Sequence, residues 1–345
     1  MAWFSALALR RRGHDVDLIV GSPPPDKISN EVPTVVVSDV EDIGAAVAKG
    51  VDVVHTFDLV DPRWANVAGS VAGHFGAVHA ITPSTDISLW EDLELGVRTC
   101  RDADALFVLT SAERRSLVAR GVRQSSLVPI GQGADIPDGA NAAAWRDRHN
   151  VQGPVVLFLG RVVRFKGWHH MLAAAPLVWK SRPDTTFVLA GPTIDDDRTQ
   201  LVEAFGDRRI LDLGEIELEE KADALAAADI LCLPSVADVF PLVFVEAWLS
   251  RCAVLTGPFL GADEIVRPGI DGLVSGIDPT ALSEALLTLL DGETAARFGA
   301  AGFDRAANEF TWEAVARKLE AQYLHCLTRG RRGPKSLKTT EKELT

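Results

Sequence analysis

The sequence has few cysteines, no long hydrophobic run and no excess of positive charge. Its four cysteines stand far apart without a CxxC pair, so we expect reduced, mostly buried thiols and no zinc site. No apolar run reaches the roughly 18 residues that a membrane-spanning helix needs. The formal net charge of −13 argues against a general nucleic-acid binder.

Residues 1–20 also lack the pattern of a secretory signal. The run ALAL precedes Arg10, Arg11 and Arg12, whereas a signal peptide carries its positive residues first. The adjacent His169 and His170 are a poor metal site, because neighbouring helical positions face different directions. We therefore expect a cytoplasmic protein with no metal and no cofactor.

An α/β pattern fills most of the 345 residues, which are enough for two domains. Short β-branched runs alternate with Ala- and Leu-rich helical patterns, the rhythm of a parallel sheet, and the rhythm restarts near the middle of the chain. The sequence therefore predicts two doubly wound units in succession. The main predicted strands are 15–20, 33–37, 51–56, 105–109, 126–130, 154–160, 185–191, 209–214, 229–234 and 252–257.

The Gly-, Ala- and Asp-rich segment before Pro154 puts the domain boundary near residue 150. We expect a first domain over 1–150, a second over 151–309, and a long amphipathic helix over 310–328 with Thr311 as its cap. The basic tail 329–345 has nothing to bury and is predicted to be disordered. The alternative is that this tail contacts anionic lipid, which would give weak peripheral association with the inner face of the membrane.

The chain opens with a helical pattern that closes near Gly13 and leads into a strand. A βα domain opens with a strand, so we expect either that the true start lies upstream or that the first domain lacks its innermost strand and the glycine loop after it. Unpaired strand edges in a sheet interior are a liability, which makes this an unusual feature.

Residues 154–175 combine a buried strand, a turn at Gly160, the cations Arg161 and Lys166, and a helix from about Gly167. Free N–H groups and the helix dipole favour an anion at a helix start, and fixed cations add to this. The pattern indicates a diphosphate site. A solvated basic turn is the alternative.

Two carboxylates follow a second buried strand. Asp238 stands in the loop after 229–234, at the edge where open α/β sheets place ligands. Glu246 lies about one turn into a helix that Pro241 can open, so it should point back to the same edge. The loop containing Glu264 is expected to open there too. The alternative is an acidic loop residue and an ordinary helical glutamate.

Cations, carboxylates and a cleft between two sheets suit a ligand with an anionic middle and polyol ends, such as a nucleotide sugar. Several segments carry a family resemblance, and their order and spacing are more specific than any one of them. They are RRGHDV, VDVVH, VPIGQGADI, LGRVVRFKG, VLAG, DLGEI, AADILCLPS, residues 238–246, GADEIVRPGIDGLV and FTWE. With these segments, most of residues 1–325 resembles the retaining family-4 glycosyltransferases of the GT-B fold.

This resemblance implies two Rossmann-like domains whose parallel sheets face across a cleft. It implies transfer of a hexosyl group from a UDP- or GDP-linked sugar to an acceptor, with retention of configuration. Arg161 and Lys166 would hold the diphosphate and stabilise the leaving group, which makes a metal unnecessary. Asp238 would lie near the donor sugar, and Glu246 would hold the ribose hydroxyls.

The resemblance also implies that backbone groups at the start of the helix meet the phosphates or the sugar. These belong to Phe240, Leu242 and Val243. The helix 310–328 would cross back to the first domain. The partners implied are a nucleotide sugar and an acceptor, which belong to glycan, glycolipid or small-molecule glycoside synthesis.

The chain departs from the family pattern at several places. Asp238 replaces a glutamate, Pro241 replaces a glycine, and the strand 76–84 offers Thr82 where many relatives have a histidine, with His79 facing elsewhere. These departures favour an alternative function, a weak or inactive GT-B protein that binds a nucleotide sugar or a partner subunit. A second alternative is another GT-B enzyme, an epimerase or a phosphorylase.

Overall fold

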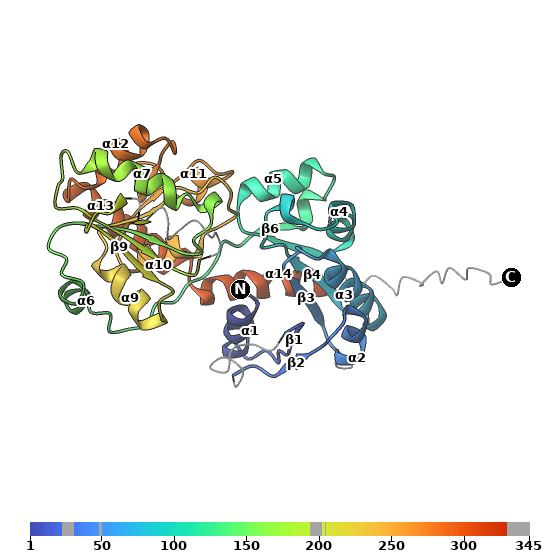
Figure 1. Cartoon of the computed structure of the whole chain (residues 1–345). Coiled ribbons are helices and arrows are strands. Elements are labelled where there is room, and N and C mark those ends of the chain that lie inside the picture. The colour runs from blue at the N-terminus through green and yellow to red at the C-terminus, as the bar shows by residue number, and fades with distance from the viewer. Residues whose placement is uncertain (23–30, 48–49, 194–201, 204, 330–345) are drawn as a thin grey trace. The chain divides into compact units, whose positions relative to one another are not determined.

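The structure, a computed structural model, describes residues 1–22, 31–47, 50–193, 202–203 and 205–329. Its contacts divide the chain into two compact units (Figure 1). Unit 1 comprises residues 1–109, 113–130 and the chain from 316 on, and unit 2 comprises 110–112 and 131–315. Parallel strands form the sheets of both units, so the predicted α/β class is confirmed.

Six parallel strands form the sheet of unit 2 in the order β12-β11-β10-β7-β8-β9. The order reverses between β7 and β10, so α7 with α12 covers one face and α9 with α10 the other (Figure 1). Strand β7 reads VVLFL and is fully buried, as a parallel strand covered on both faces must be. The strands are β7 (Val155–Leu159), β8 (Thr186–Ala190), β9 (Ile210–Gly214), β10 (Ile230–Leu233), β11 (Ala253–Thr256) and β12 (Gly272–Val274).

Local signals set the ends of several helices of unit 2. The side chain of Asp278 accepts a hydrogen bond from Ala281 N ahead of α12, and Pro279 opens that helix. Thr311 Oγ1 accepts from Ala314 N at 3.1 Å, which confirms Thr311 as the cap of the last helix. The helices are α6 (Ala142–Arg148), α7 (Trp168–Val178), α9 (Leu218–Ala227), α10 (Leu242–Leu249), α11 (Ala262–Ile265), α12 (Pro279–Leu289), α13 (Glu293–Glu309) and α14 (Trp312–Thr328).

Unit 1 holds a four-stranded parallel sheet, β3-β4-β5-β6, and a separate parallel pair, β1-β2. All five residues of β4 are buried, whereas all five of β3 are only half-buried. Among the described residues no strand joins β1 to β3. The strands are β1 (Leu18–Val20), β2 (Thr34–Val36), β3 (Val53–Phe57), β4 (Val78–Thr82), β5 (Ala105–Val108) and β6 (Leu127–Pro129).

The helices of unit 1 begin with α1, which ends just before Gly13 as the sequence predicts; Gly13 has a φ of 94°. Asp61 caps α3 through Arg63 N, Pro62 is its first residue, and Gly76 ends it in the left-handed region. From residue 316 on, α14 also belongs to this unit. The helices are α1 (Ala2–Arg11), α2 (Ile43–Ala46), α3 (Pro62–Phe75), α4 (Leu93–Asp102) and α5 (Ser111–Ala119).

Residues 131–150, which the sequence analysis assigned to the first domain, group with unit 2. The reason is α6, which packs on α9 with Trp145 fully buried. Arg146 ties it there by donating to the carbonyls of Gly153 and Ala227. The tail predicted to be disordered lies, apart from Arg329, outside the described residues.

The cysteines behave largely as expected. Cys100, Cys232 and Cys252 are buried free thiols, and burial raises the pKa of each. Cys326 is only partly buried. Within the described residues, no helical stretch has both the length and the hydrophobicity of a membrane-spanning segment.

Candidate functional site

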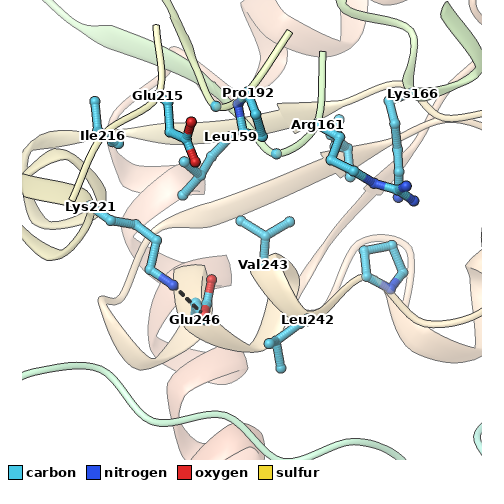
Figure 2. A pocket seen from close by; sticks show the side chains of 14 residues that line it. Leu159, Arg161, Lys166, Pro192, Glu215, Ile216, Lys221, Leu242, Val243 and Glu246 are labelled. Carbon is cyan, nitrogen blue, oxygen red and sulfur yellow. Dashed lines mark hydrogen bonds and ion pairs between the residues drawn. The ribbon is translucent and has the colours of Figure 1, made fainter. Parts of the chain in front are cut away.

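A cavity of about 340 Å³ opens in unit 2 at the carboxyl ends of β7, β8, β9 and β10 (Figure 2). The strand order reverses between β7 and β10, and this switch point is where open α/β sheets bind ligands. Its volume lies in the range of small-molecule sites. The lining residues are Leu159, Gly160, Arg161, Lys166, Gly191, Pro192, Glu215, Ile216, Lys221, Leu233, Pro241, Leu242, Val243 and Glu246.

One side of the cavity is cationic. Arg161 and Lys166 follow β7 and both line this side of the cavity (Figure 2). Gly160 has a φ of 143° and no atom within 4 Å of the place where a side chain would begin, so the backbone there is open to a ligand. Gly167 ends the turn at a φ of 80° and starts α7. These residues occupy the positions that the sequence predicts for an anion site.

Lys166 is already paired within the protein. Its Nζ donates to Asp238 Oδ2, and the two side chains are only 14% and 13% exposed. Asp238 Oδ1 accepts from Val239 N at 3.1 Å, which holds the carboxylate in its loop. Asp238 itself is not among the residues that line the cavity. The aspartate therefore neutralises the cation that the sequence analysis assigned to the diphosphate.

Glu246 lies on the opposite wall, inside α10, with its side chain 7% exposed. Pro241 is the cap of this helix rather than its first residue, and Leu242 and Val243 at the first turn line the cavity. Lys221 of α9 donates to Glu246 Oε1 at 2.7 Å. A largely buried carboxylate is thereby kept paired, which avoids the cost of an isolated buried charge.

The predicted site residues did not include Lys221 or the residues that follow β8 and β9. Gly191 and Pro192 come directly after β8, and Glu215 and Ile216 directly after β9. A signal existed for these four, because parallel strands of one sheet end at the same edge. The signal for Lys221 was weaker. It was only the position of this residue about one turn into α9, the helix that follows β9.

Two other residues do not join the cavity. The Phe240 ring is buried and packs edge-on against Phe310, with ring centres 5.4 Å apart. Glu264, expected at the same mouth, instead accepts from the backbone N–H groups of Ser111 and Ala112 at 2.8 and 3.2 Å. It therefore satisfies free donors at the start of α5 and is not among the lining residues, which corrects the expectation.

Thr82, at the end of β4 in unit 1, is completely buried. Its hydroxyl is 2.9 Å from His55 Nε2, and His55 Nδ1 is 2.5 Å from the Tyr323 hydroxyl. His79 lies on the other side of the strand against α3, where a side chain at Gly69 would come within 2.7 Å of its ring. Thr82 is thus part of an internal hydrogen-bonded chain.

The described residues contain no group of three or more His, Cys, Asp or Glu side chains placed to hold a metal ion. The rings of His169 and His170 do lie near each other, with centres 4.0 Å apart. Two residues alone do not make a metal centre of the usual kind.

Known proteins resemble this chain in both sequence and structure. Residues 153–292 match the sequence model of the family "Glycosyl transferases group 1". A GDP-mannose-dependent monoacylated alpha-(1-6)-phosphatidylinositol monomannoside mannosyltransferase of Corynebacterium glutamicum is 31% identical over 48% of this chain and 46% of its own length. A D-inositol 3-phosphate glycosyltransferase of Corynebacterium efficiens is 32% identical over 66% of this chain and 58% of its own. The chain thus spans about half the length of the curated relatives it matches.

Solved structures show the same fold along nearly the whole chain. Sucrose-phosphate synthase from Thermosynechococcus elongatus has a TM-score of 0.77 at 22% identity, covering 94% of this chain and 92% of its own. Anabaena HepE, in complex with UDP and glucose, has a TM-score of 0.78 at 17% identity, covering 94% and 96%. The chain therefore has the GT-B fold, and its residues 153–292 resemble the glycosyl transferases group 1 family.

Proposed function

We propose that the chain is a glycosyltransferase that takes a hexosyl group from a nucleotide diphosphate sugar and passes it to an acceptor. One observation carries this proposal. A single cavity at the switch point of a parallel sheet has Arg161 and Lys166 on one side and a paired, largely buried Glu246 on the other. That order of charges matches a diphosphate joined to a ribose.

The cationic side would bind the diphosphate and stabilise it as the leaving group. Negative charge grows on the leaving phosphate as the glycosidic bond breaks, and fixed cations in a partly water-excluded site lower the energy of that state. The first turn of α10, at Leu242 and Val243, adds backbone donors and the positive end of a helix. With these charges in place, we propose that transfer needs no metal ion.

Glu246 would accept hydrogen bonds from the ribose hydroxyls. Its Oε1 is held by Lys221, which leaves Oε2 to accept from the ribose. Lys221 acts here as a positioning residue, because it keeps the carboxylate in one rotamer and balances its charge. Asp238 would approach the donor sugar once the diphosphate has drawn Lys166 away.

The activities of relatives support a nucleotide sugar as donor. One relative is described as GDP-mannose-dependent, and a structural neighbour was solved with UDP and glucose. We propose retention of configuration at the transferred sugar, as the family resemblance implies. The anomeric configuration of the product, read by NMR, tests this point separately.

The decisive experiment measures donor consumption with UDP-glucose and GDP-mannose in the full chain. Lys166→Ala should lower the rate by roughly 100-fold, because a cation aimed at the leaving group is lost. Arg164→Ala is the matched control, since Arg164 lies on the same turn but does not line the cavity. Equal rates in both variants would contradict the assigned role, and loss of activity in EDTA would contradict metal independence.

A second candidate is a protein that binds the nucleotide sugar without turning it over. Two observations favour it: Asp238 is bound to Lys166 rather than facing the cavity, and Thr82 is buried against His55. Stabilisation by GDP or UDP with no donor consumed would support this candidate. If neither nucleotide raises the melting temperature at millimolar concentration, both candidates fail.

A further inference from the structure

The side of the cavity away from Arg161 and Lys166 carries its own carboxylate. Glu215 follows β9 and points into the cavity, with Ile216 beside it and Pro192 at the end of β8 (Figure 2). Within the described part of the chain, no hydrogen bond or ion pair involves the Glu215 carboxylate. The proposed diphosphate and ribose roles do not use this residue.

The order of groups in a nucleotide decides what meets Glu215. The diphosphate lies with the cations and the ribose with Glu246, so the base extends to the remaining side of the cavity. There Ile216 and Pro192 offer apolar surface for the face of a ring. Glu215 offers two acceptor oxygens and no donor to its edge.

Nucleobases differ in how they can meet such a carboxylate. Guanine presents two neighbouring donors, N1–H and the 2-amino group, which pair with both oxygens at once. Uracil presents one N–H between two carbonyl oxygens, and those oxygens would face the carboxylate. Adenine and cytosine each place a ring nitrogen lone pair beside their amino group. Bidentate, charge-assisted pairs are the strong ones, so a carboxylate here discriminates among bases.

We propose that Glu215 is a specificity-determining residue that selects a guanine nucleotide, which makes the donor a GDP-linked sugar. This inference rests on the proposed function, because it takes the positions of the diphosphate and the ribose from it. It goes further in naming the base and the side chain that reads it.

The test measures the dissociation constants of GDP, IDP and UDP by calorimetry with the full chain. IDP lacks only the 2-amino group, so it removes one of the two donors. Wild type should bind GDP at least about 10-fold more tightly than UDP, with IDP in between. IDP loses one of the two bonds to the carboxylate, and uracil in addition turns a second carbonyl oxygen toward it. Glu215→Gln should bring GDP and IDP to within about 3-fold of each other and shrink the preference over UDP, since an amide offers one acceptor.

The matched control is Glu217→Gln, an exposed neighbour on the same loop that does not line the cavity. It should keep the preference of the wild type. A wild type that binds UDP as tightly as GDP overturns the proposal, and so does a preference for GDP that survives in Glu215→Gln. Failure of all three nucleotides to bind wild type overturns the proposed function itself, and the base selectivity falls with it.

Discussion

At the scale of single residues, the most consequential contact is the pair between Lys166 and Asp238. An aspartate is one methylene shorter than the glutamate that the family resemblance expects. Its carboxylate accepts from Val239 N and from Lys166, and it does not reach the cavity wall. A diphosphate must therefore compete with Asp238 for the same cation.

Removing the charge of Asp238 should strengthen the binding of a free nucleotide diphosphate. In Asp238→Asn, Lys166 keeps a hydrogen-bonding neighbour but loses its counter-ion, so we expect GDP or UDP to bind roughly 3- to 10-fold more tightly. Calorimetry of the free nucleotide measures this. Asp263→Asn, an exposed carboxylate of the same unit, controls for net charge. Weaker binding in Asp238→Asn would show that the aspartate supports the site rather than competing with it.

A second residue-scale effect concerns His55, whose pKa is lowered to about 3 by burial first and by the nearby His79 second. The side chain keeps some exposed surface, but both ring nitrogens are engaged with Thr82 and Tyr323. In the unfolded chain a histidine binds a proton near pH 6.5. Below that pH, His55 therefore binds a proton in the unfolded state but stays neutral in the folded state.

This shift predicts that the free energy of unfolding decreases as the pH falls from about 6.5 toward 3. The stability contributed by neutral His55 is fully present above pH 6.5. The free energy of unfolding should drop by about 1.4 kcal/mol per pH unit from this group. Denaturant titrations at pH 7, 6 and 5 on wild type and His55→Gln isolate it. The glutamine keeps hydrogen-bonding capacity but cannot titrate. The free energy of unfolding of the variant should therefore change less with pH than that of wild type. Identical slopes would contradict the assignment.

At the scale of elements, the position of Glu246 depends on how α10 packs against α13. Trp248 lies on α10 two residues after Glu246, is fully buried, and donates through its indole N–H to Asp271 O at 2.8 Å. Gly302 of α13 lies directly against the Trp248 ring, where a side chain would overlap it. The close approach of the two helices requires a glycine at this point.

Gly302→Ala should therefore destabilise the protein by about 1–3 kcal/mol, the usual cost of overpacking a core. The measurement is the free energy of unfolding in denaturant. Gly73→Ala in α3 makes the matched control, because no atom lies within 4 Å of the new methyl group. In that helix alanine should raise stability by about 0.5–1 kcal/mol. A Gly302 variant as stable as wild type would mean that α10 and α13 can separate freely.

At the scale of the whole molecule, the chain consists of two compact units, and every residue that lines the cavity belongs to unit 2. A nucleotide at about 100 times its dissociation constant stabilises the fold that binds it by about 2.7 kcal/mol. The stabilisation should appear first in the elements that contact the ligand. These are the ends of β7 to β10 and the first turns of α9 and α10.

Hydrogen exchange in the presence of GDP should therefore slow at amides of unit 2 around residues 159–166, 214–221 and 241–246. Amides of unit 1 around β3 and β4 should exchange as in the free protein. Mass spectrometry of peptides from both units in one experiment provides the control internally. Protection confined to unit 1 would place the nucleotide site elsewhere.

Much of this architecture could be predicted from the sequence. The buried parallel strands appear as continuous apolar runs, and all ten main runs became strands β1 to β3 and β5 to β11. The sixth strand of unit 2, β12, was not predicted from the sequence. Gly160, Arg161, Lys166, Leu242, Val243 and Glu246 reached one cavity because the ends of parallel strands share an edge.

Only the tertiary structure decided which charges meet. Lys166 with Asp238, Lys221 with Glu246, and Glu264 with the start of α5 are separated by 72, 25 and about 150 residues in the sequence. Such pairs depend on helix rotation and side-chain reach across neighbouring elements, and no local pattern encodes either. The sequence alone therefore determined the parallel sheets and the edge that binds a ligand, because both follow from hydrophobic periodicity. The partner of each charged side chain was decided by tertiary packing, because it depends on which elements the fold brings together.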